Sequence, residues 1–366
     1  MSIPFEQLKP PKWGGEVPEP IDVEPLVLGP DCVVDPPVIL SPMAAVTNPP
    51  FRKLCREMGA GLVVTEMVSD KGLVHGSERT LRMVDLQPEE SPVGVQLYGK
   101  DPQMMARAAK VAESMGADLV DVNMGCPMRK VVSSGHGAAL LREPQRVAEI
   151  FAAMSEAVDI PVTGKTRAAW EDTDAIEVAQ AMDRSGAAAL TIHGRTRGEG
   201  YAGHADLGVI RALVNAVDMP VIGNGDVCDW KSCRRMFKAT GCDGVMVARG
   251  ALGNPWVFRE ILADLQGRPI PGRPGPADKR AMVRRHVELY VQYVGVERMT
   301  REIRKHLLWY FRGTPGEKVL RRRLGSLESL ADVHDAIDAA IDANGGIDQI
   351  GAKSHPRGAA IEQSAS

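Results

Sequence analysis

The sequence has few aromatic residues, and it lacks several patterns that mark common classes of protein. Phe, Trp and Tyr make up only 4% of its 366 residues, which argues against a surface built on aromatic side chains that stack on bases. The six cysteines contain no C-x-x-C pair, so we expect neither a disulfide framework nor a zinc or other metal site. No apolar run approaches the length of a membrane span, and the N-terminus lacks a basic-then-apolar signal pattern. These absences predict a soluble cytoplasmic protein.

The net charge of −3 is distributed unevenly along the chain. Between Asp278 and Arg323 there are thirteen Lys and Arg residues but only five Asp and Glu residues. The rest of the chain carries 31 basic and 42 acidic residues and is therefore acidic. A basic segment attached to an acidic body favours a face that binds a polyanion, although a solvated charged helix is an equally common explanation.

Eight apolar runs from residue 38 onward are typical of buried strands, and they begin in two alternating ways. Four of them follow a proline: Pro37, Pro92, Pro161 and Pro220. The other four follow a glycine of the kind that ends a helix: Gly59, Gly116, Gly186 and Gly241. Amphipathic stretches such as 104–114 and 175–184 separate the runs.

Eight alternating strand and helix units predict a closed (β/α)8 TIM barrel, an α/β fold, over residues 38–266. A doubly wound open sheet is the alternative, but nothing marks a reversal of strand order and no G-x-G-x-x-G follows the first run. Residues 1–37 contain nine prolines and are expected to form an arm packed on the barrel. The Pro- and Gly-rich stretch 267–276 predicts a linker, 277–345 an all-helical domain, and 346–366 a disordered tail.

The stretch Asn123-Met124-Gly125-Cys126-Pro127 places a cysteine directly after a predicted buried strand. Gly125 and Pro127 constrain the backbone on both sides, so the thiol is held at the carboxyl end of the sheet. Active groups lie at that end in parallel α/β folds. A small buried cysteine is the plain alternative, but packing alone does not require a rigid frame. We therefore interpret Cys126 as a candidate catalytic residue.

Polar or charged residues follow seven of the eight predicted strands, and a barrel would gather them at one rim. They include Pro42-Met43-Ala44 with Ser41, Glu66, Gln96, Asn123, Lys165, Arg167, His193, Arg195, Asn224, Gly225, Asp226, Ala248 and Arg249. The turns after the last two strands are rich in glycine, where barrels commonly hold a phosphate, and Arg249 offers a bidentate partner. Lys165 alone could be an ion-pair partner at the barrel mouth. Taken together, the residues predict an active site.

These motifs resemble those of the tRNA-dihydrouridine synthases. The cysteine motif followed by Gly137-Ala138-Ala139-Leu140 is the most specific part of the likeness. The other shared motifs occur in the expected order: Ser41-Pro42-Met43-Ala44, Gln96-Leu97, Lys165-Thr166-Arg167, His193-Gly194-Arg195-Thr196-Arg197, Asn224-Gly225-Asp226 and Gly253-Asn254-Pro255-Trp256. Arg304-Lys305-His306, Trp309-Tyr310 and Gly313 resemble the helical domain of the bacterial B-type branch.

The resemblance implies reduction of a uridine C5–C6 bond in tRNA, with FMN bound and NADPH as the usual reductant. Cys126 would be the general acid, Lys165 would stabilise charge on the reduced flavin, and His193 with Arg195 would bind uracil oxygens or the nearby phosphate. FMN would be held by Pro42, Met43, Ala44, Gln96, Lys165, His193, Asn224, Gly225, Asp226, Ala248 and Arg249. The chain departs from the family pattern at Gly164, Thr166, Leu207 and Ala248.

The target uridine lies inside a folded RNA, so it must be turned out while the backbone is held elsewhere. A helix near 299–312 would place its basic side chains on one side and its apolar side chains on another. We expect the basic side to bind tRNA through Arg301, Arg304, Lys305 and Arg312. Two alternatives stay open: a flavin barrel acting on a free pyrimidine, as dihydroorotate dehydrogenase does, and a non-catalytic tRNA-binding protein.

Overall fold

The computed structural model describes residues 16–170 and 175–345, which group into two compact units. Residues 22–250 form the first unit, and residues 251–345 together with 16–21 form the second. The domain boundaries expected at 266 and 277 stay a prediction. The tail expected over 346–366, like the first fifteen residues of the arm, lies outside the described residues.

The first unit contains all eight expected strands. They are β3 (Val38–Leu40), β4 (Leu62–Val64), β6 (Val93–Tyr98), β7 (Leu119–Met124), β8 (Val162–Arg167), β9 (Ala189–His193), β10 (Val221–Asn224) and β11 (Gly244–Val247). A positive φ, which only glycine adopts without a side-chain penalty, is found at each of the four predicted helix-ending glycines, Gly59, Gly116, Gly186 and Gly241. Each of these helices therefore ends shortly before the glycine that the sequence predicts.

The eight strands close into a barrel. They pair in parallel in chain order from β3 to β11, and β11 pairs with β3 to complete the cycle. At the closing step Val245 lies opposite Val38, and at the β4–β6 step Val63 lies opposite Val93. A two-residue strand, β5 (Val68–Ser69), pairs with the end of β6 outside this cycle. The predicted (β/α)8 TIM barrel is confirmed.

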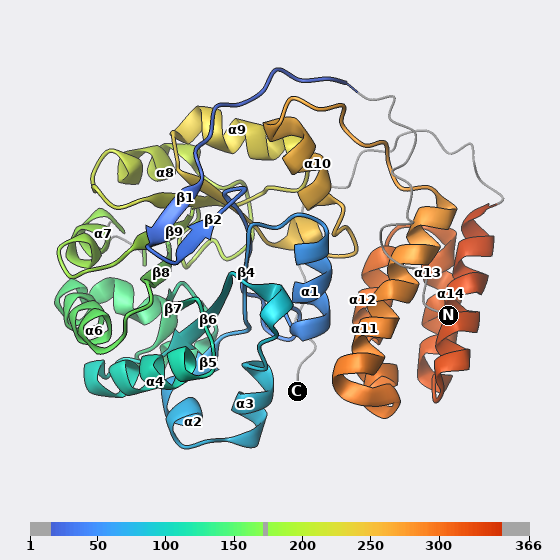
Figure 1. Ribbon diagram of the computed structural model, residues 1–366, viewed down its shortest axis with the longest axis horizontal. Coiled ribbons are helices and arrows are strands. Elements are labelled where there is room, and N and C mark those ends of the chain that lie inside the picture. The colour runs from blue at the N-terminus through green and yellow to red at the C-terminus, as the bar shows by residue number, and fades with distance from the viewer. Residues whose placement is uncertain (1–15, 171–174, 346–366) are drawn as a thin grey trace. The chain divides into compact units, whose positions relative to one another are not determined.

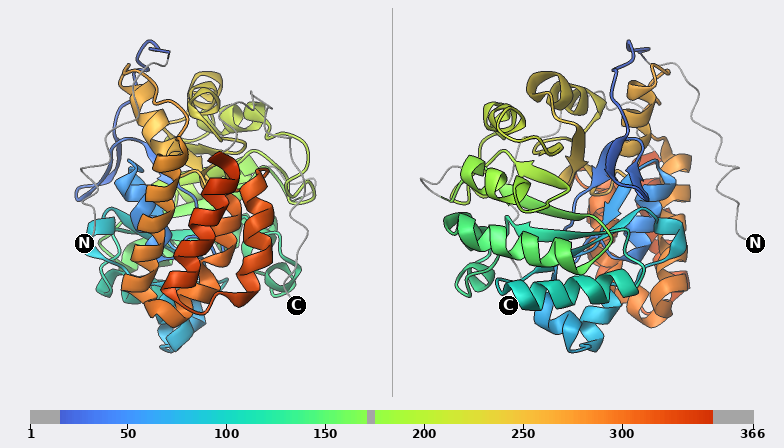
Figure 2. Two further views of the ribbon diagram at one scale, coloured as in Figure 1. Left: turned by 90° about the vertical axis from the view of Figure 1, so that its right-hand side faces the viewer. Right: turned by 60° about the vertical axis from the view of Figure 1, so that its left-hand side comes forward.

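Helices connect successive strands and surround the barrel (Figures 1 and 2). They are α1 (Pro49–Glu57), α2 (Asp70–Val74), α3 (Glu78–Met83), α4 (Pro102–Ser114), α5 (Arg129–Val132), α6 (Pro144–Ala157), α7 (Ala175–Asp183), α8 (Leu207–Val214) and α9 (Trp230–Thr240). Local sequence sets where they start. In α4, for example, Asp101 Oδ1 accepts a hydrogen bond from the Met104 N–H at 2.8 Å, and Pro102 occupies the first turn.

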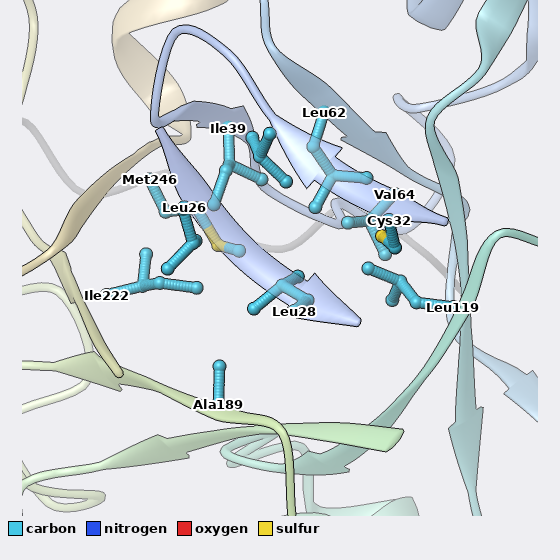
Figure 3. Close-up of a cluster of buried hydrophobic side chains, with 11 residues drawn as sticks. Leu26, Leu28, Cys32, Ile39, Leu62, Val64, Leu119, Ala189, Ile222 and Met246 are labelled. Atoms are coloured by element: carbon cyan, nitrogen blue, oxygen red, sulfur yellow. The ribbon is translucent and has the colours of Figure 1, made fainter. Parts of the chain in front are cut away.

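A hairpin that the sequence analysis did not anticipate covers the amino-terminal end of the barrel (Figure 3). Its strands, β1 (Leu26–Gly29) and β2 (Cys32–Val34), pair antiparallel within the segment expected to be an arm. Its outward residues Val27 and Val33 are 61% and 45% exposed. Its inward residues join the barrel strands in one buried cluster: Leu26, Leu28, Cys32, Val34, Ile39, Leu62, Val64, Leu119, Ala189, Ile222 and Met246.

The described part of the second unit is helical. Its helices are α10 (Val257–Leu265), α11 (Pro276–Glu302), α12 (Arg304–Tyr310), α13 (Pro315–Arg323) and α14 (Leu330–Gly345). α14 buries one face through Val333, Ala336, Ile337, Ala340 and Ile341, at the spacing of an amphipathic helix. No helix in the described ranges is long and apolar enough to cross a lipid bilayer.

The helix expected near 299–312 is divided in the structure into two helices at Ile303, whose φ of −67° and ψ of −23° stay helical. α11 ends at Glu302, and α12 begins at Arg304 and ends at Tyr310. The Thr300 carbonyl accepts a hydrogen bond from Arg304 Nε at 2.9 Å at this junction. Arg312 therefore lies beyond the end of α12 instead of on a face shared with the other basic residues.

Candidate active site

The predicted strand-end residues of the first unit lie at one rim, because all eight barrel strands run parallel. The register places Asn123 of β7 beside Lys165 of β8, and His193 of β9 beside Asn224 of β10. Side-chain hydrogen bonds connect these residues along neighbouring strands, from β6 to β7 and from β7 to β8, and Lys165 of β8 reaches Asn224 of β10 past β9.

A buried carboxylate, Asp121, orients the amide side chains beneath the rim. Its Oδ2 accepts a hydrogen bond from Gln96 Nε2 at 2.7 Å, and its Oδ1 accepts one from Thr163 Oγ1 at 2.8 Å. Gln96 Oε1 in turn accepts a hydrogen bond from Asn123 Nδ2 at 2.9 Å. Burial raises the pKa of Asp121, against the lowering effect of its two hydrogen bonds. Sequence reasoning missed Asp121, although strand alternation places it on the same face as Asn123.

The loop that carries Cys126 is fixed by side chains on several sides. Asn123 Oδ1 accepts hydrogen bonds from the backbone N–H groups of Cys126 at 3.0 Å and Gly125 at 3.4 Å. Arg167 Nε donates to the Gly125 carbonyl at 2.7 Å. Gly137 has a φ of 58° and lies so close that a Cβ there would be 2.9 Å from the Cys126 carbonyl oxygen. The backbone that carries the thiol is therefore held in place by the protein itself.

The Cys126 side chain is half-buried at this rim. Burial raises the pKa of its thiol, and the Met128 backbone N–H and the charge of Arg167 counteract this only in part. An ordinary thiol has a pKa of about 8.5, so this one is protonated at neutral pH. A protonated thiol can donate a proton, whereas a nucleophile would have to be the thiolate.

Lys165 carries a positive charge into the barrel mouth. Its Nζ donates a hydrogen bond to Asn224 Oδ1 at 3.1 Å, and Asn224 Nδ2 donates to the Met246 carbonyl at 2.8 Å. Burial lowers the pKa of Lys165 to about 8; the charge of Arg167 acts in the same direction and that of Asp121 opposes it. The ammonium group is therefore mostly charged at neutral pH and can stabilise an anionic group.

Arg195 is an internal anchor of the loop 194–206. It donates to both carboxylate oxygens of Asp226 at 2.8 Å and to the carbonyls of Ala202 and Gly203 at 2.8 Å. Its side chain is only 1% exposed. The guanidinium group thus holds the loop, and Asp226 is likewise engaged by Arg195 and by the Ala205 N–H at 2.8 Å.

His193 is neutral in this environment. Burial, followed by the charges of Lys165, Arg167, Arg195 and Arg249, lowers the pKa of His193 to about 2. Arg195 Nη1 lies 3.2 Å from His193 Nε2. Because a guanidinium can only donate, Nε2 must be the acceptor, and the proton therefore sits on Nδ1.

Tyr201 joins the site although sequence reasoning did not single it out. Its ring lies 4.8 Å from the Arg249 guanidinium, 5.5 Å from that of Arg167 and 6.3 Å from the His193 ring. The side chain is 56% exposed, so the ring is available at the rim. Its place in an irregular loop after β9 carries no periodic signal that would have identified it.

The loops predicted to hold a cofactor follow β3, β10 and β11. In the first, Pro42 and Met43 are half-buried and Ala44 is exposed. In the other two the backbones approach closely, because a Cβ on Gly250 would lie 2.3 Å from the Val227 carbonyl oxygen. Arg249 Nη2 donates to Asp226 Oδ1 at 3.3 Å.

At Gly164, one of the four residues that depart from the family pattern, the surrounding side chains accommodate the change. A Cβ on Gly164 would lie 2.7 Å from Met182 Cε and 2.8 Å from both Met124 Cε and Phe151 Cζ. Large neighbours therefore fill the room that a larger aliphatic residue would take. Of the other departures, Thr166 is buried, and Ala248 and Leu207 are half-buried.

The four basic residues predicted to bind RNA belong to the second unit and differ in exposure. Arg301 and Arg312 are exposed, and Arg301 pairs with Glu297 at 3.0 Å. Arg304 is half-buried, and its guanidinium donates to two backbone carbonyls of its own unit. Lys305 is also half-buried. Arg304 therefore has a structural role that its sequence position does not reveal.

Comparisons with known proteins identify the family of this chain. A family model described as dihydrouridine synthase matches residues 39–346. A tRNA-dihydrouridine synthase B of Pseudomonas aeruginosa is 41% identical over 295 residues, covering 80% of this chain and 88% of the relative. The enzyme of the same name from Proteus vulgaris is 40% identical over 306 residues, covering 82% and 94%.

Solved structures with low sequence identity share the fold. A histamine dehydrogenase from Rhizobium sp. 4-9 superposes with a TM-score of 0.53 at 12% identity, covering 87% of this chain and 64% of that chain. This likeness supports the barrel fold alone. On the family match and the close relatives, the chain belongs to the dihydrouridine synthase family, within its bacterial B-type branch.

Proposed function

We propose that the protein reduces a uridine of tRNA to 5,6-dihydrouridine with bound FMN, and that Cys126 donates the proton. The observation that carries the proposal is a half-buried thiol of raised pKa, locked by its loop at the same rim as Lys165 and the neutral His193. Relatives named tRNA-dihydrouridine synthase B support both the reaction and the tRNA substrate.

The residues at the rim fit FMN. Among the described residues, the Lys165 ammonium has one hydrogen-bond acceptor, Asn224 Oδ1, which leaves donors for a flavin oxygen or ring nitrogen. Gly225 and Gly250 lie in the turns after β10 and β11, where a phosphate is commonly held, and Arg249 supplies a cation there. We propose that FMN is held by Pro42, Met43, Ala44, Gln96, Lys165, His193, Asn224, Gly225, Asp226, Ala248 and Arg249.

FMN, when bound, supplies the hydride that goes to C6 of uracil. The side chains supply charge, orientation and the proton. Lys165 stabilises negative charge in the barrel mouth, and His193 can donate a hydrogen bond from Nδ1 to a uracil oxygen. Because Arg195 is buried against Asp226, we propose that it positions the loop 194–206 instead of contacting uracil.

Cys126 completes the reduction by proton transfer. Hydride addition at C6 leaves negative charge on C5 and O4, and the proton moves from Sγ to C5 as the S–H bond breaks. The positive charge of Arg167 stabilises the thiolate that is left behind. This contribution opposes the effect of burial, which raises the pKa of the thiol. Solvent then returns the proton to the sulfur.

We further propose NADPH as the reductant of the flavin.

The tRNA substrate makes the cytoplasm the expected location. The target base lies within a folded RNA, so it must leave its stack to reach the rim.

The test is dihydrouridine formation in tRNA. We expect the purified protein to carry flavin and, expressed in a strain without other dihydrouridine synthases, to restore dihydrouridine detected by mass spectrometry. Cys126→Ala should keep its flavin and lose product formation by about 100-fold or more, since general acid catalysis contributes about 10²–10⁴.

The matched control is Cys228→Ala, which removes an exposed cysteine from the loop after β10 and should keep activity. Full activity in Cys126→Ala would refute the acid role. Turnover of a free pyrimidine without RNA would favour the alternative of a small-molecule reductase, and a colourless protein that binds tRNA would favour the non-catalytic alternative.

A further inference from the structure

We propose that Tyr98, Lys100 and His136, together with Lys71, form a surface that binds the nucleotide next to the reacting uridine. We call these four residues the β6 rim surface. Lys71 and Lys100 would contact its phosphate, and the rings of Tyr98 and His136 would stack on its base. The inference rests on the proposed function, because it assigns part of the RNA substrate to the barrel itself.

Tyr98 is aimed at the rim by the strand that carries it. It is the last residue of β6 and lies two residues beyond Gln96, so the two side chains project from the same face of the strand. Gln96 points into the barrel, where it contacts Asp121. The next residue packs tightly against α2 and α4, because a Cβ on Gly99 would lie 2.3 Å from Asp70 Oδ2 and 2.4 Å from Met105 Sδ. The Tyr98 ring therefore stands half-exposed at the mouth.

His136 links this ring to the catalytic loop. The rings of Tyr98 and His136 have centroids 5.8 Å apart and are tilted by 56°. The next residues pack on the cysteine: the Ala138 N–H donates to the Cys126 carbonyl at 3.1 Å, and a Cβ on Gly137 would lie 3.1 Å from Cys126 Cβ. The half-exposed ring pair is therefore adjacent to the loop that holds the proposed acid.

Two exposed lysines and one buried carboxylate lie around the ring pair. Lys100 is exposed, and its Nζ would lie 3.1 Å from a Cβ on Gly135, the residue before His136. Lys71 is exposed at the start of α2. Burial has the largest effect and lowers the pKa of His136; the charge of Asp70, next in size, raises it, and the charges of Lys100 and Lys71 lower it. The Asp70 carboxylate is buried and accepts from the Lys71 N–H at 2.6 Å, so it does not face the solvent beside the lysines.

This combination fits a nucleotide with an exposed base. When one base leaves its stack, its neighbour loses a stacking partner, and an aromatic ring can replace it whatever the base. Both tyrosines of the first unit, Tyr98 and Tyr201, lie at this rim. The low aromatic content argues against a broad stacking surface, but a single ring pair, Tyr98 and His136, next to the Cys126 loop requires no enrichment.

The experiment compares tRNA reduction by Tyr98→Ala, Tyr98→Phe and Lys100→Glu with the wild type. In single turnovers of the pre-reduced enzyme, we expect Tyr98→Ala to raise the half-saturating tRNA concentration about 5- to 100-fold, because one base stack is lost. Tyr98→Phe keeps the ring and should stay within about 2-fold of the wild type. Lys100→Glu should weaken tRNA binding and reduce the slope of log affinity against log salt by about 1.

The matched control is Lys110→Glu, which reverses an exposed charge on α4. Its tRNA affinity and salt slope should change much less than those of Lys100→Glu. The proposed surface would be refuted if Lys100→Glu and Lys110→Glu changed tRNA affinity equally. It would also be refuted if Tyr98→Ala and Tyr98→Phe had the same tRNA affinity. The flavin content and the NADPH oxidation measured in the absence of tRNA should be unchanged in Tyr98→Ala. A loss of either would also refute the proposed surface, because it would show that Tyr98 has a structural role. Failure of the wild type to form dihydrouridine would instead refute the proposed function.

Discussion

Two side chains at the barrel mouth are held in the protonation states that the proposed reaction needs. Burial raises the pKa of the Cys126 thiol and so keeps its proton, whereas it lowers the pKa of Lys165 to about 8. The raised pKa keeps Cys126 available as an acid. The lowered pKa means that Lys165 loses its positive charge close to physiological pH. Both groups act in their protonated forms, so the loss of either proton lowers activity as pH rises. The two losses occur at different pH values.

The pH profile of uridine reduction should report Lys165. Below about pH 8 the ammonium is charged and the rate is high; as pH rises through that value the charge is lost and the rate should fall. The measurement is kcat/KM for tRNA with pre-reduced enzyme from about pH 6 to about pH 10. In Lys165→Arg the fall near pH 8 should disappear, because guanidinium does not titrate there. A profile flat up to pH 10 in the wild type, or an unchanged fall in Lys165→Arg, would contradict this assignment.

At the scale of elements, the hairpin β1–β2 shows how a segment rich in proline still contributes to the core. It touches the starts of three separate barrel strands: Leu26 lies near Gly244 of β11, Val34 near Gly61 before β4, and Gly29 near Pro161 before β8. The hairpin therefore closes the end of the barrel opposite the candidate site.

Removing an inward hairpin side chain should destabilise the protein. Leu26 is 3% exposed, so Leu26→Ala should lower the free energy of unfolding by about 2–5 kcal/mol. Val27→Ala, on the outward face at 61% exposure, should change it by less than about 0.5 kcal/mol. Urea denaturation of the two variants measures the difference. Equal unfolding midpoints would show that the hairpin does not cover the barrel end in solution.

At the scale of the whole molecule, basic charge is concentrated in the stretch 278–323 of the second unit, while the rest of the chain is acidic. The basic residues do not all serve the same purpose. Arg304 is half-buried and donates to two backbone carbonyls, whereas Arg312 is exposed beyond the end of α12. A phosphate contact requires an exposed cation, so we propose Arg312 as the better RNA ligand of the two.

Charge reversal separates these two roles. Arg312→Glu should weaken tRNA binding and reduce its salt slope by about 1 without changing the unfolding midpoint. Arg304→Glu should lower the unfolding midpoint, because its hydrogen bonds to the carbonyls are lost. Arg235→Glu, an exposed position on α9, is the charge-matched control and should leave binding nearly unchanged. If Arg312→Glu behaves like Arg235→Glu, Arg312 does not contact RNA.

The sequence by itself determined the barrel, because proline before a strand and glycine after a helix are local signals that repeat through eight units. It also identified the rim residues, since parallel strands must all end on one side. Only the tertiary structure decided what those side chains do: Arg195 is an anchor buried against Asp226, Arg304 holds backbone carbonyls, and Asp121 orients Gln96 from below. The hairpin and the ring pair of Tyr98 and His136 were also decided there. Their partners lie far away in the chain, and contacts between distant segments leave no periodic trace in a single sequence.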